Sequence, residues 1–143
     1  MYGEILAPLA KIAAATGRQL IVKLHPMENL RERKKIVKQV LDRSALARTR
    51  VVQGRLTEEL LNSTWCAVTV LSTTAVDCTL RGIPVFLCEW LDYSSYGYLQ
   101  QFAKFGAGRC LRGPSEIADI PRMVKSFVPP DTRDLHEPIT SER

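Results

Sequence analysis

The chain has 143 residues, of which 45% are hydrophobic and 24% charged, and its formal net charge is +5. This length suits one ordinary domain, and the composition excludes long intrinsic disorder. No apolar run approaches the roughly 20 residues of a membrane span, and the N-terminus lacks a secretory pattern. We therefore expect a cytoplasmic protein, with peripheral attachment to the inner face of the membrane left open.

Three elements are expected in the first third of the chain. An apolar stripe predicts a helix over residues 5–16, in which Pro8 is tolerable only if the helix starts near it. The continuous apolar run over 19–24 predicts a strand buried on both faces. A basic helix is expected over 28–43, because Val37 and Val40 recur at helical spacing and leave the charges on the other side. Its basic run contains no aromatic residue, so we expect a solvated face and no nucleic-acid binding.

Strand and helix patterns continue to alternate along the rest of the chain. Apolar runs predict strands over 50–53, 66–71, 84–88 and 108–111, and helical spacing predicts helices over 57–61, 75–81, 96–105 and 114–127. Such alternation implies an α/β fold, a three-layer, doubly wound and mostly parallel sheet of about five strands with right-handed crossovers. We expect this Rossmann-like domain over residues 1–127 and an irregular tail over 128–143.

The cysteines do not predict a metal site. No Cys-x-x-Cys pair occurs among them, and the chain has only two histidines. We expect reduced, buried side chains that act as small hydrophobic residues, at Cys66, Cys78, Cys88 and Cys110.

A first group of polar residues follows the strand over 19–24. Pro26 has no N–H and biases His25 away from helical geometry, so the chain must turn out of the sheet there. In an open parallel sheet, ligands bind outside the carboxyl ends of the strands. Together, Lys23 and His25 would suit a phosphate or a leaving group that develops negative charge. The alternative is that His25 satisfies a loop carbonyl.

A second group opens the helix after the strand over 66–71. Backbone N–H groups at a helix N-terminus, the helix dipole and the three hydroxyls of Ser72, Thr73 and Thr74 would suit a phosphate. Helix capping alone would account for one hydroxyl. Asp77, one turn further along, is either a ribose ligand or an ordinary helix acid.

These segments resemble a known family. VKLHP and the later run VVQGRLTEELLNSTWCAVTVLSTTAVDCTLRGIPVFL are similar to the C-terminal, donor-binding half of GT-B glycosyltransferases. The nearest branch contains bacterial capsule polysaccharide, CDP-glycerol and polysialic acid transferases. Its members carry Lys-x-His-Pro after one strand and a serine- and threonine-rich turn after a later one, usually followed by Glu-Ala and Gly-x-Pro. The resemblance covers about residues 20–117, two thirds of the chain.

The resemblance implies a role for each of these residues. The donor's phosphates would be bound by Lys23, His25, Ser72, Thr73 and Thr74, and His25 is also the candidate catalytic residue. The nucleotide base would lie against Gly54, Arg55 and Leu56. Asp77 stands where the family more often has glutamate, and its shorter side chain reaches less far toward the ribose. We expect a CMP- or CDP-linked sugar donor sooner than a UDP-linked one, with no metal and no other cofactor.

The resemblance also implies a missing part. GT-B enzymes have two Rossmann-like halves, and this chain has room for one, beginning at Met1 almost directly in a helix where the family usually has a strand. We expect no catalysis without an N-terminal acceptor half, supplied on the same polypeptide or as a second subunit. Two other classes stay open. One is a flavodoxin-like or receiver-like module for protein partners, disfavoured by the few acids at the strand ends, and the other is a sugar-nucleotide epimerase-like domain.

Overall fold

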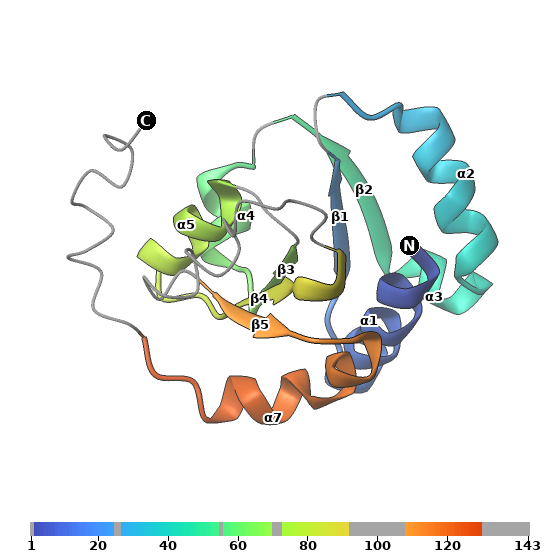
Figure 1. The fold of residues 1–143 in the computed structure, drawn as a ribbon. Helices are drawn as coiled ribbons and strands as arrows, with labels where there is room; N and C mark the ends of the chain where they lie inside the picture. The colour runs from blue at the N-terminus through green and yellow to red at the C-terminus, as the bar shows by residue number, and fades with distance from the viewer. Residues whose placement is uncertain (1, 25–26, 55, 70–72, 92–107, 130–143) are drawn as a thin grey trace. The chain divides into compact units, whose positions relative to one another are not determined.

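The chain forms two compact units, Met1–Thr57 and Glu58–Arg143, each with its own parallel sheet. The structure is a computed structural model that describes residues 2–24, 27–54, 56–69, 73–91 and 108–129, and Figure 1 draws their helices and strands. The α/β class with parallel strands is therefore confirmed. A continuous sheet of about five strands, one domain over 1–127 and a separate tail over 128–143 stay predictions.

Within the described ranges, no helix combines the length and the apolar character that crossing a membrane requires.

The first unit pairs two parallel strands and covers them with helices. The register joins Leu20 to Thr49 at one end of the pair and Leu24 to Gln53 at the other. Both strands lie within two residues of their predicted bounds. The elements of this unit, in chain order, are α1 (Tyr2–Thr16), β1 (Leu20–Leu24), α2 (Leu30–Val40), α3 (Arg43–Ala47) and β2 (Thr49–Gln53).

One side of β1 forms the core of the first unit. Val22 and Leu24 are buried in a single cluster with residues of α1 and α2, whereas Ile21 and Lys23 are half-buried. Complete burial on both faces was therefore a wrong expectation for this strand. Burying alternate side chains leaves Lys23 on the other face, where an ammonium group keeps access to water. The core cluster consists of Leu6, Val22, Leu24, Val37 and Leu41.

Two helix predictions in this unit need correction. Helix α1 begins at Tyr2, so Pro8, which has no backbone N–H to donate, lies inside the helix and not near its start. The basic helix expected over 28–43 is two helices, because Leu41 adopts an extended conformation and Asp42 caps a new one. The Oδ1 atom of Asp42 accepts a hydrogen bond of 2.7 Å from the Ala45 N–H. A local cap therefore ends an apolar pattern that continues through it.

The second unit has three parallel strands in the order β3-β4-β5. All four residues of the central strand β4 are buried, as in a strand covered on both faces. The elements of this unit are α4 (Glu58–Asn62), β3 (Ala67–Thr69), α5 (Thr73–Leu80), β4 (Val85–Cys88), the 3₁₀ turn η1 (Glu89–Leu91), β5 (Arg109–Leu111), the 3₁₀ segment η2 (Pro114–Asp119) and α7 (Ile120–Lys125).

The helix expected over 114–127 is a 3₁₀ segment that continues as an α-helix. The Ile120 N–H donates to the carbonyl of Ile117, three residues back, as in a 3₁₀ turn. The next residue, Pro121, has no N–H to continue the ladder. The change from η2 to α7 therefore coincides with a proline that the apolar spacing hides. The helix predicted over 96–105 lies outside the described residues, as do positions 70 and 71 of the predicted strand over 66–71.

Gly108 allows the chain to approach β4 closely at the start of β5. A Cβ atom added there would lie 2.8 Å from Cγ of Leu87, which is fully buried in the central strand. We predict that Gly108→Ala lowers the free energy of unfolding by about 1 to 3 kcal/mol, because Leu87 has no space into which to shift. Urea denaturation followed by circular dichroism measures this loss.

Gly113→Ala is the matched control for this substitution. Gly113 has a φ of −167°, and an added Cβ would meet nothing within 4 Å. Its denaturation midpoint should stay near that of the wild type. Equal midpoints for the two variants would show that the contact with Leu87 does not constrain the fold.

Candidate functional site

The candidate site in the first unit begins where β1 and β2 end together. Because the register pairs Leu24 with Gln53, both parallel strands finish at the same edge of the sheet. Lys23 reaches this edge half-buried, and its Nζ lies 3.4 Å from the carbonyl oxygen of Leu24. No salt bridge to Lys23 is present among the described residues. His25 and Pro26 follow directly and lie outside the described part of the chain.

The chain that returns from this edge to α2 is attached to the end of β2. The Gln53 Nε2 donates a hydrogen bond of 3.0 Å to the carbonyl of Glu28, and the Glu28 carboxylate lies 2.9 Å from Nε of Arg33. Asn29 then caps α2 by accepting the Glu32 N–H at 3.1 Å. These contacts fix the start of α2 relative to the ends of both strands. Sequence reasoning missed them, since Gln53 and Glu28 are 25 positions apart and belong to no pattern.

Gly54 turns the chain away from β2 at the predicted base-binding segment. Its φ is +92°, a conformation that L-residues with a side chain rarely adopt, and an added Cβ would meet nothing within 4 Å. Leu56 is half-buried, and Arg55 lies outside the described residues. The structure thus leaves an open backbone turn beside the end of β2, and the base-binding role of these three residues stays a prediction.

In the second unit, α5 begins four residues after β3 ends. The helix starts at Thr73, two residues before its predicted start, so Thr73 and Thr74 belong to its first turn. Ser72 lies outside the described residues. The inner side of the helix is firmly packed, since Ala75 and Cys78 are each 1% exposed. This packing fixes the N-terminus of α5 after β3, as the prediction of a phosphate-binding turn requires.

Asp77 lies on the solvent side of α5. Its side chain is exposed and forms no ion pair among the described residues. Its backbone carbonyl accepts a hydrogen bond of 2.9 Å from Nη1 of Arg81, whose Nη2 is paired with Glu58 of α4. Because Glu58 engages the nearby guanidinium, the Asp77 carboxylate remains available as an acceptor. Its role in ribose binding stays a prediction.

The structure adds Arg112 to the candidate residues. It follows β5 directly, so it stands at the carboxyl edge of the second sheet, and its side chain is exposed. Its backbone N–H donates to Oε2 of Glu116 at 3.2 Å, which fixes the turn into η2. A basic residue at the carboxyl end of a predicted strand is a signal similar to the one that singled out Lys23, which is the penultimate residue of β1. Arg112 was not among the predicted site residues because the predicted strand before it, over 108–111, is short.

Burial keeps two thiols protonated next to these edges. Burial raises the pKa of the Cys88 thiol to about 11, and burial followed by the nearby Asp77 carboxylate raises the pKa of Cys78. None of the four cysteines forms a disulfide, as predicted, but Cys66 and Cys110 are only half-buried. Among the residues that the structure describes, no group of three His, Cys, Asp or Glu side chains could hold a metal ion.

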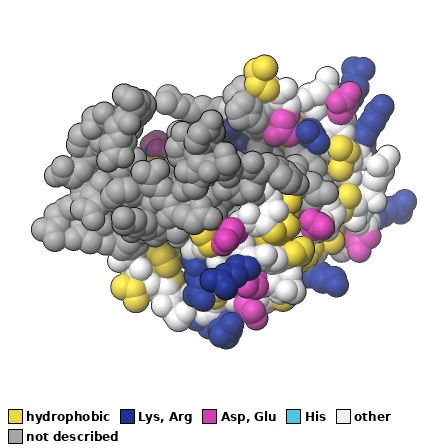
Figure 2. All heavy atoms as spheres, in the orientation of Figure 1, with side chains coloured by type: hydrophobic (Ala, Val, Ile, Leu, Met, Phe, Trp, Pro, Cys, Tyr) yellow, Lys and Arg dark blue, Asp and Glu magenta, His cyan; other side chains and the backbone are white. Residues whose placement is uncertain are grey.

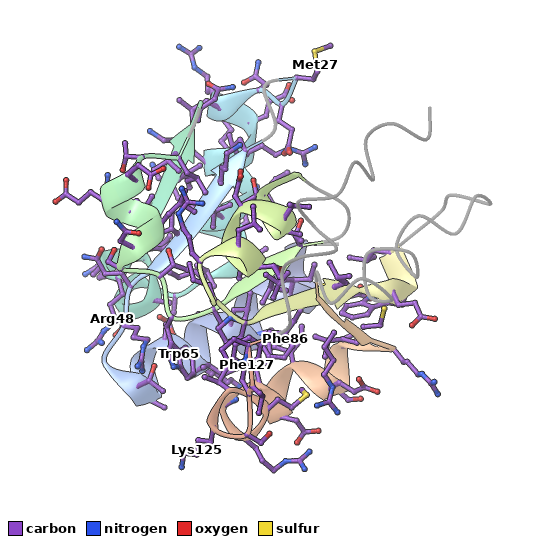
Figure 3. All side chains as sticks on the ribbon, turned by 90° about the vertical axis from the view of Figure 1, so that its left-hand side faces the viewer. Met27, Arg48, Trp65, Phe86, Lys125 and Phe127 are labelled. Carbon is purple, nitrogen blue, oxygen red and sulfur yellow. The ribbon has the colours of Figure 1, made fainter. Side chains whose placement is uncertain are left out.

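A pocket of about 290 Å³ lies in the second unit but away from the predicted edge. It is lined by the residues that open β4 and β5 and by the segment after α7, and Figure 3 labels Phe86 and Phe127 in its wall. These positions are at the amino ends of the strands. Ligands of open parallel sheets bind at the carboxyl ends, so this pocket does not coincide with the candidate site.

Comparison with known proteins returns no match: no family model, curated protein or solved structure is similar to this chain. The resemblance to GT-B glycosyltransferases therefore rests on the sequence motifs alone, and the role of each site residue stays a prediction.

The raised pKa of Cys88 predicts a loss of stability at alkaline pH. The thiol has a pKa of about 11 in the folded chain and 9.0 when exposed to solvent. Between these values the unfolded chain releases a proton that the folded chain keeps, so the free energy of unfolding falls as pH rises from 9 to 11, by roughly 2 kcal/mol from this group. In denaturant titrations, the difference in the free energy of unfolding between the wild type and Cys88→Ala should decrease by this amount between pH 9 and 11.

Measurements from pH 6 to 8 are the internal control. The thiol is protonated there in both the folded and the unfolded chain, so the difference in free energy of unfolding between the two proteins should be constant. Lysine and tyrosine titrations affect both proteins alike and cancel in the difference. If the difference in free energy of unfolding at pH 11 equals that at pH 7, the raised pKa of Cys88 is wrong.

Proposed function

We propose that this chain is the nucleotide-sugar-binding half of a glycosyltransferase of bacterial surface or capsule polysaccharide synthesis. The donor is a CMP- or CDP-linked sugar, and an N-terminal acceptor half completes the enzyme. The observation that carries the proposal is Lys23, a half-buried cation at the carboxyl edge of two parallel strands with no ion pair among the described residues.

Lys23 is suited to an anionic ligand for electrostatic reasons. A partly buried ammonium group loses hydration, and here the hydrogen bond found in the structure is a 3.4 Å contact with a neighbouring backbone carbonyl. A phosphate at this edge would supply the missing negative charge through a charge-assisted hydrogen bond. In the proposed reaction, Lys23 and His25 stabilise the charge that develops on the leaving nucleotide when the sugar–phosphate bond breaks.

Features of the second unit support a second set of phosphate contacts. Helix α5 begins at Thr73, four residues after β3 ends, and Thr74 follows in its first turn. This first turn presents backbone N–H groups and the positive end of the helix dipole. Arg112 adds a cation at the carboxyl edge of the same sheet. The proposal therefore assigns phosphate contacts to residues at the carboxyl edge of each of the two sheets.

The alternative functions find less support in the described residues. A receiver-like module needs a cluster of acids at the strand ends, whereas β1, β2 and β3 end in Leu24, Gln53 and Thr69. An epimerase-like domain needs carboxylates around the donor sugar. Among the described residues at the two edges, Glu89 follows β4 and Asp77 lies on α5, and these two carboxylates do not form a cluster around a sugar site. Donor binding therefore remains the stronger proposal.

A nucleotide titration of the whole chain tests the proposal. We predict that CDP or CMP shifts the amide NMR signals of residues around 23 and 54, and that Lys23→Gln weakens CDP binding by about tenfold to a hundredfold, the effect of one charge-assisted hydrogen bond. Binding of cytidine, which has no phosphate, should change little in this variant. UDP, titrated in parallel, reports on the choice of base.

Lys11→Gln is the matched control, because Lys11 is an exposed lysine on α1 away from the strand ends. It should bind CDP as the wild type does. His25→Ala and Ser72→Ala test one predicted phosphate ligand in each unit, and both should weaken CDP binding. The proposal fails if no nucleotide shifts these signals at millimolar concentration, or if Lys11→Gln weakens binding as much as Lys23→Gln.

A further inference from the structure

Four basic side chains form a straight stripe along the outer side of α2. They occupy positions i, i+3, i+4 and i+7, which fall on one side of a helix, and all four are exposed. Together with Leu30 they line a hollow of about 380 Å³. Figure 2 shows Lys and Arg side chains projecting along the edge where Figure 1 draws this helix. We call these residues the α2 stripe: Arg31, Lys34, Lys35 and Lys38.

The stripe is not neutralised by the described residues of its own unit. No salt bridge joins any of its members to a carboxylate there, and the Glu28 carboxylate is occupied by Arg33, on another side of α2. Like charges at i, i+3 and i, i+4 destabilise a helix, and a cation in its first turn opposes the dipole. Repulsion within the stripe therefore opposes the favourable dipole interaction of Lys38 in the last turn, and an anionic partner would relieve it.

The two units differ strongly in charge. Residues 1–57 contain 12 Lys and Arg against 4 Asp and Glu, whereas residues 58–143 contain 8 against 11. Their formal charges are thus +8 and −3. A surface in the first unit is attracted to polyanions even though the whole chain carries only +5.

An exposed apolar side chain stands just before the stripe. Met27 is 87% exposed, and Figure 3 shows it projecting outward two residues before Asn29, the N-cap of α2. A flexible apolar side chain beside cations suits a lipid surface, in which headgroups attract the cations and the acyl boundary receives the apolar group. The stripe contains no aromatic residue on which nucleic-acid bases would stack.

We propose that the α2 stripe and Met27 dock the protein on an anionic lipid bilayer. The four side chains lie within roughly 10 Å along the helix axis and are all exposed, so they can meet an anionic surface together. Among the described residues these four side chains form no ion pair, and flexible cations of this kind match a fluid array of anionic headgroups. This proposal does not depend on nucleotide binding.

Vesicle binding of the full chain tests the proposal. The wild type should sediment with vesicles of phosphatidylcholine containing about one third phosphatidylglycerol, and not with pure phosphatidylcholine vesicles. Each cation near such a surface contributes about fivefold to the partition coefficient, so Lys34→Gln/Lys35→Gln/Lys38→Gln should lower it by roughly 100-fold. Met27→Ser should lower it several-fold, because the apolar contribution is lost. Raising the salt concentration should release the wild type.

The matched control is Lys11→Gln/Arg43→Gln/Arg50→Gln, which removes the same charge from exposed positions of the same unit outside the stripe. It should retain most of the vesicle binding, and circular dichroism should show that both triple variants are folded. The proposal is overturned if the wild type does not bind the anionic vesicles, or if the two triple variants lose binding equally. Tighter stripe-dependent binding to single-stranded DNA or to polyglutamate than to vesicles would likewise overturn it, in favour of a nucleic-acid or an acidic protein partner.

Discussion

Parallel pairing of β1 with β2 is the constraint on which the first unit depends. Two parallel strands cannot be joined by a tight turn, so α2 and α3 must carry the chain back to the start of β2. The return is possible because Val37 of α2 is buried in the same cluster as Val22 and Leu24 of β1. The same pairing makes both strands end together, and the alternation of β1 leaves Lys23 outside the core at that edge. The candidate site and the core are thus two consequences of one strand register.

The central strand β4 has the same importance in the second unit. With all four of its residues buried, it has a neighbouring parallel strand on each side, so its side chains have no freedom to relax. The close approach of Gly108 to Leu87 and the protonated thiol of Cys88 both follow from this burial. Helix α5 is held on the same sheet through Ala75 and Cys78. The edge that carries the predicted phosphate-binding turn is therefore supported by a densely packed sheet.

The sequence predicted those features that depend on continuous apolar runs. Each described strand lies within two residues of its expected bounds, although only β4 is buried along its whole length. What it could not predict depends on polar atoms and local geometry. The apolar spacing runs through Leu41 and conceals the new helix that Asp42 caps, and the bond from Gln53 to Glu28 joins positions 25 residues apart. Apolar periodicity contains no information on such contacts. The candidate residues could therefore be predicted, but the hydrogen bonds and ion pairs that hold their segments in place could not.

Helix α2 contributes to the core, to the ion pair with Glu28 and to the exposed surface of the first unit. One of its sides packs Val37 into the core, a second directs Arg33 to the Glu28 carboxylate, and the third carries the α2 stripe. Glu28 is also held through its backbone carbonyl by Gln53 at the end of β2. A rigid helix therefore links the stripe to the segment that follows Lys23 and His25. Because Val37 packs α2 into the core and Arg33 holds the returning chain through Glu28, the position of α2 also determines where the chain after β1 turns back.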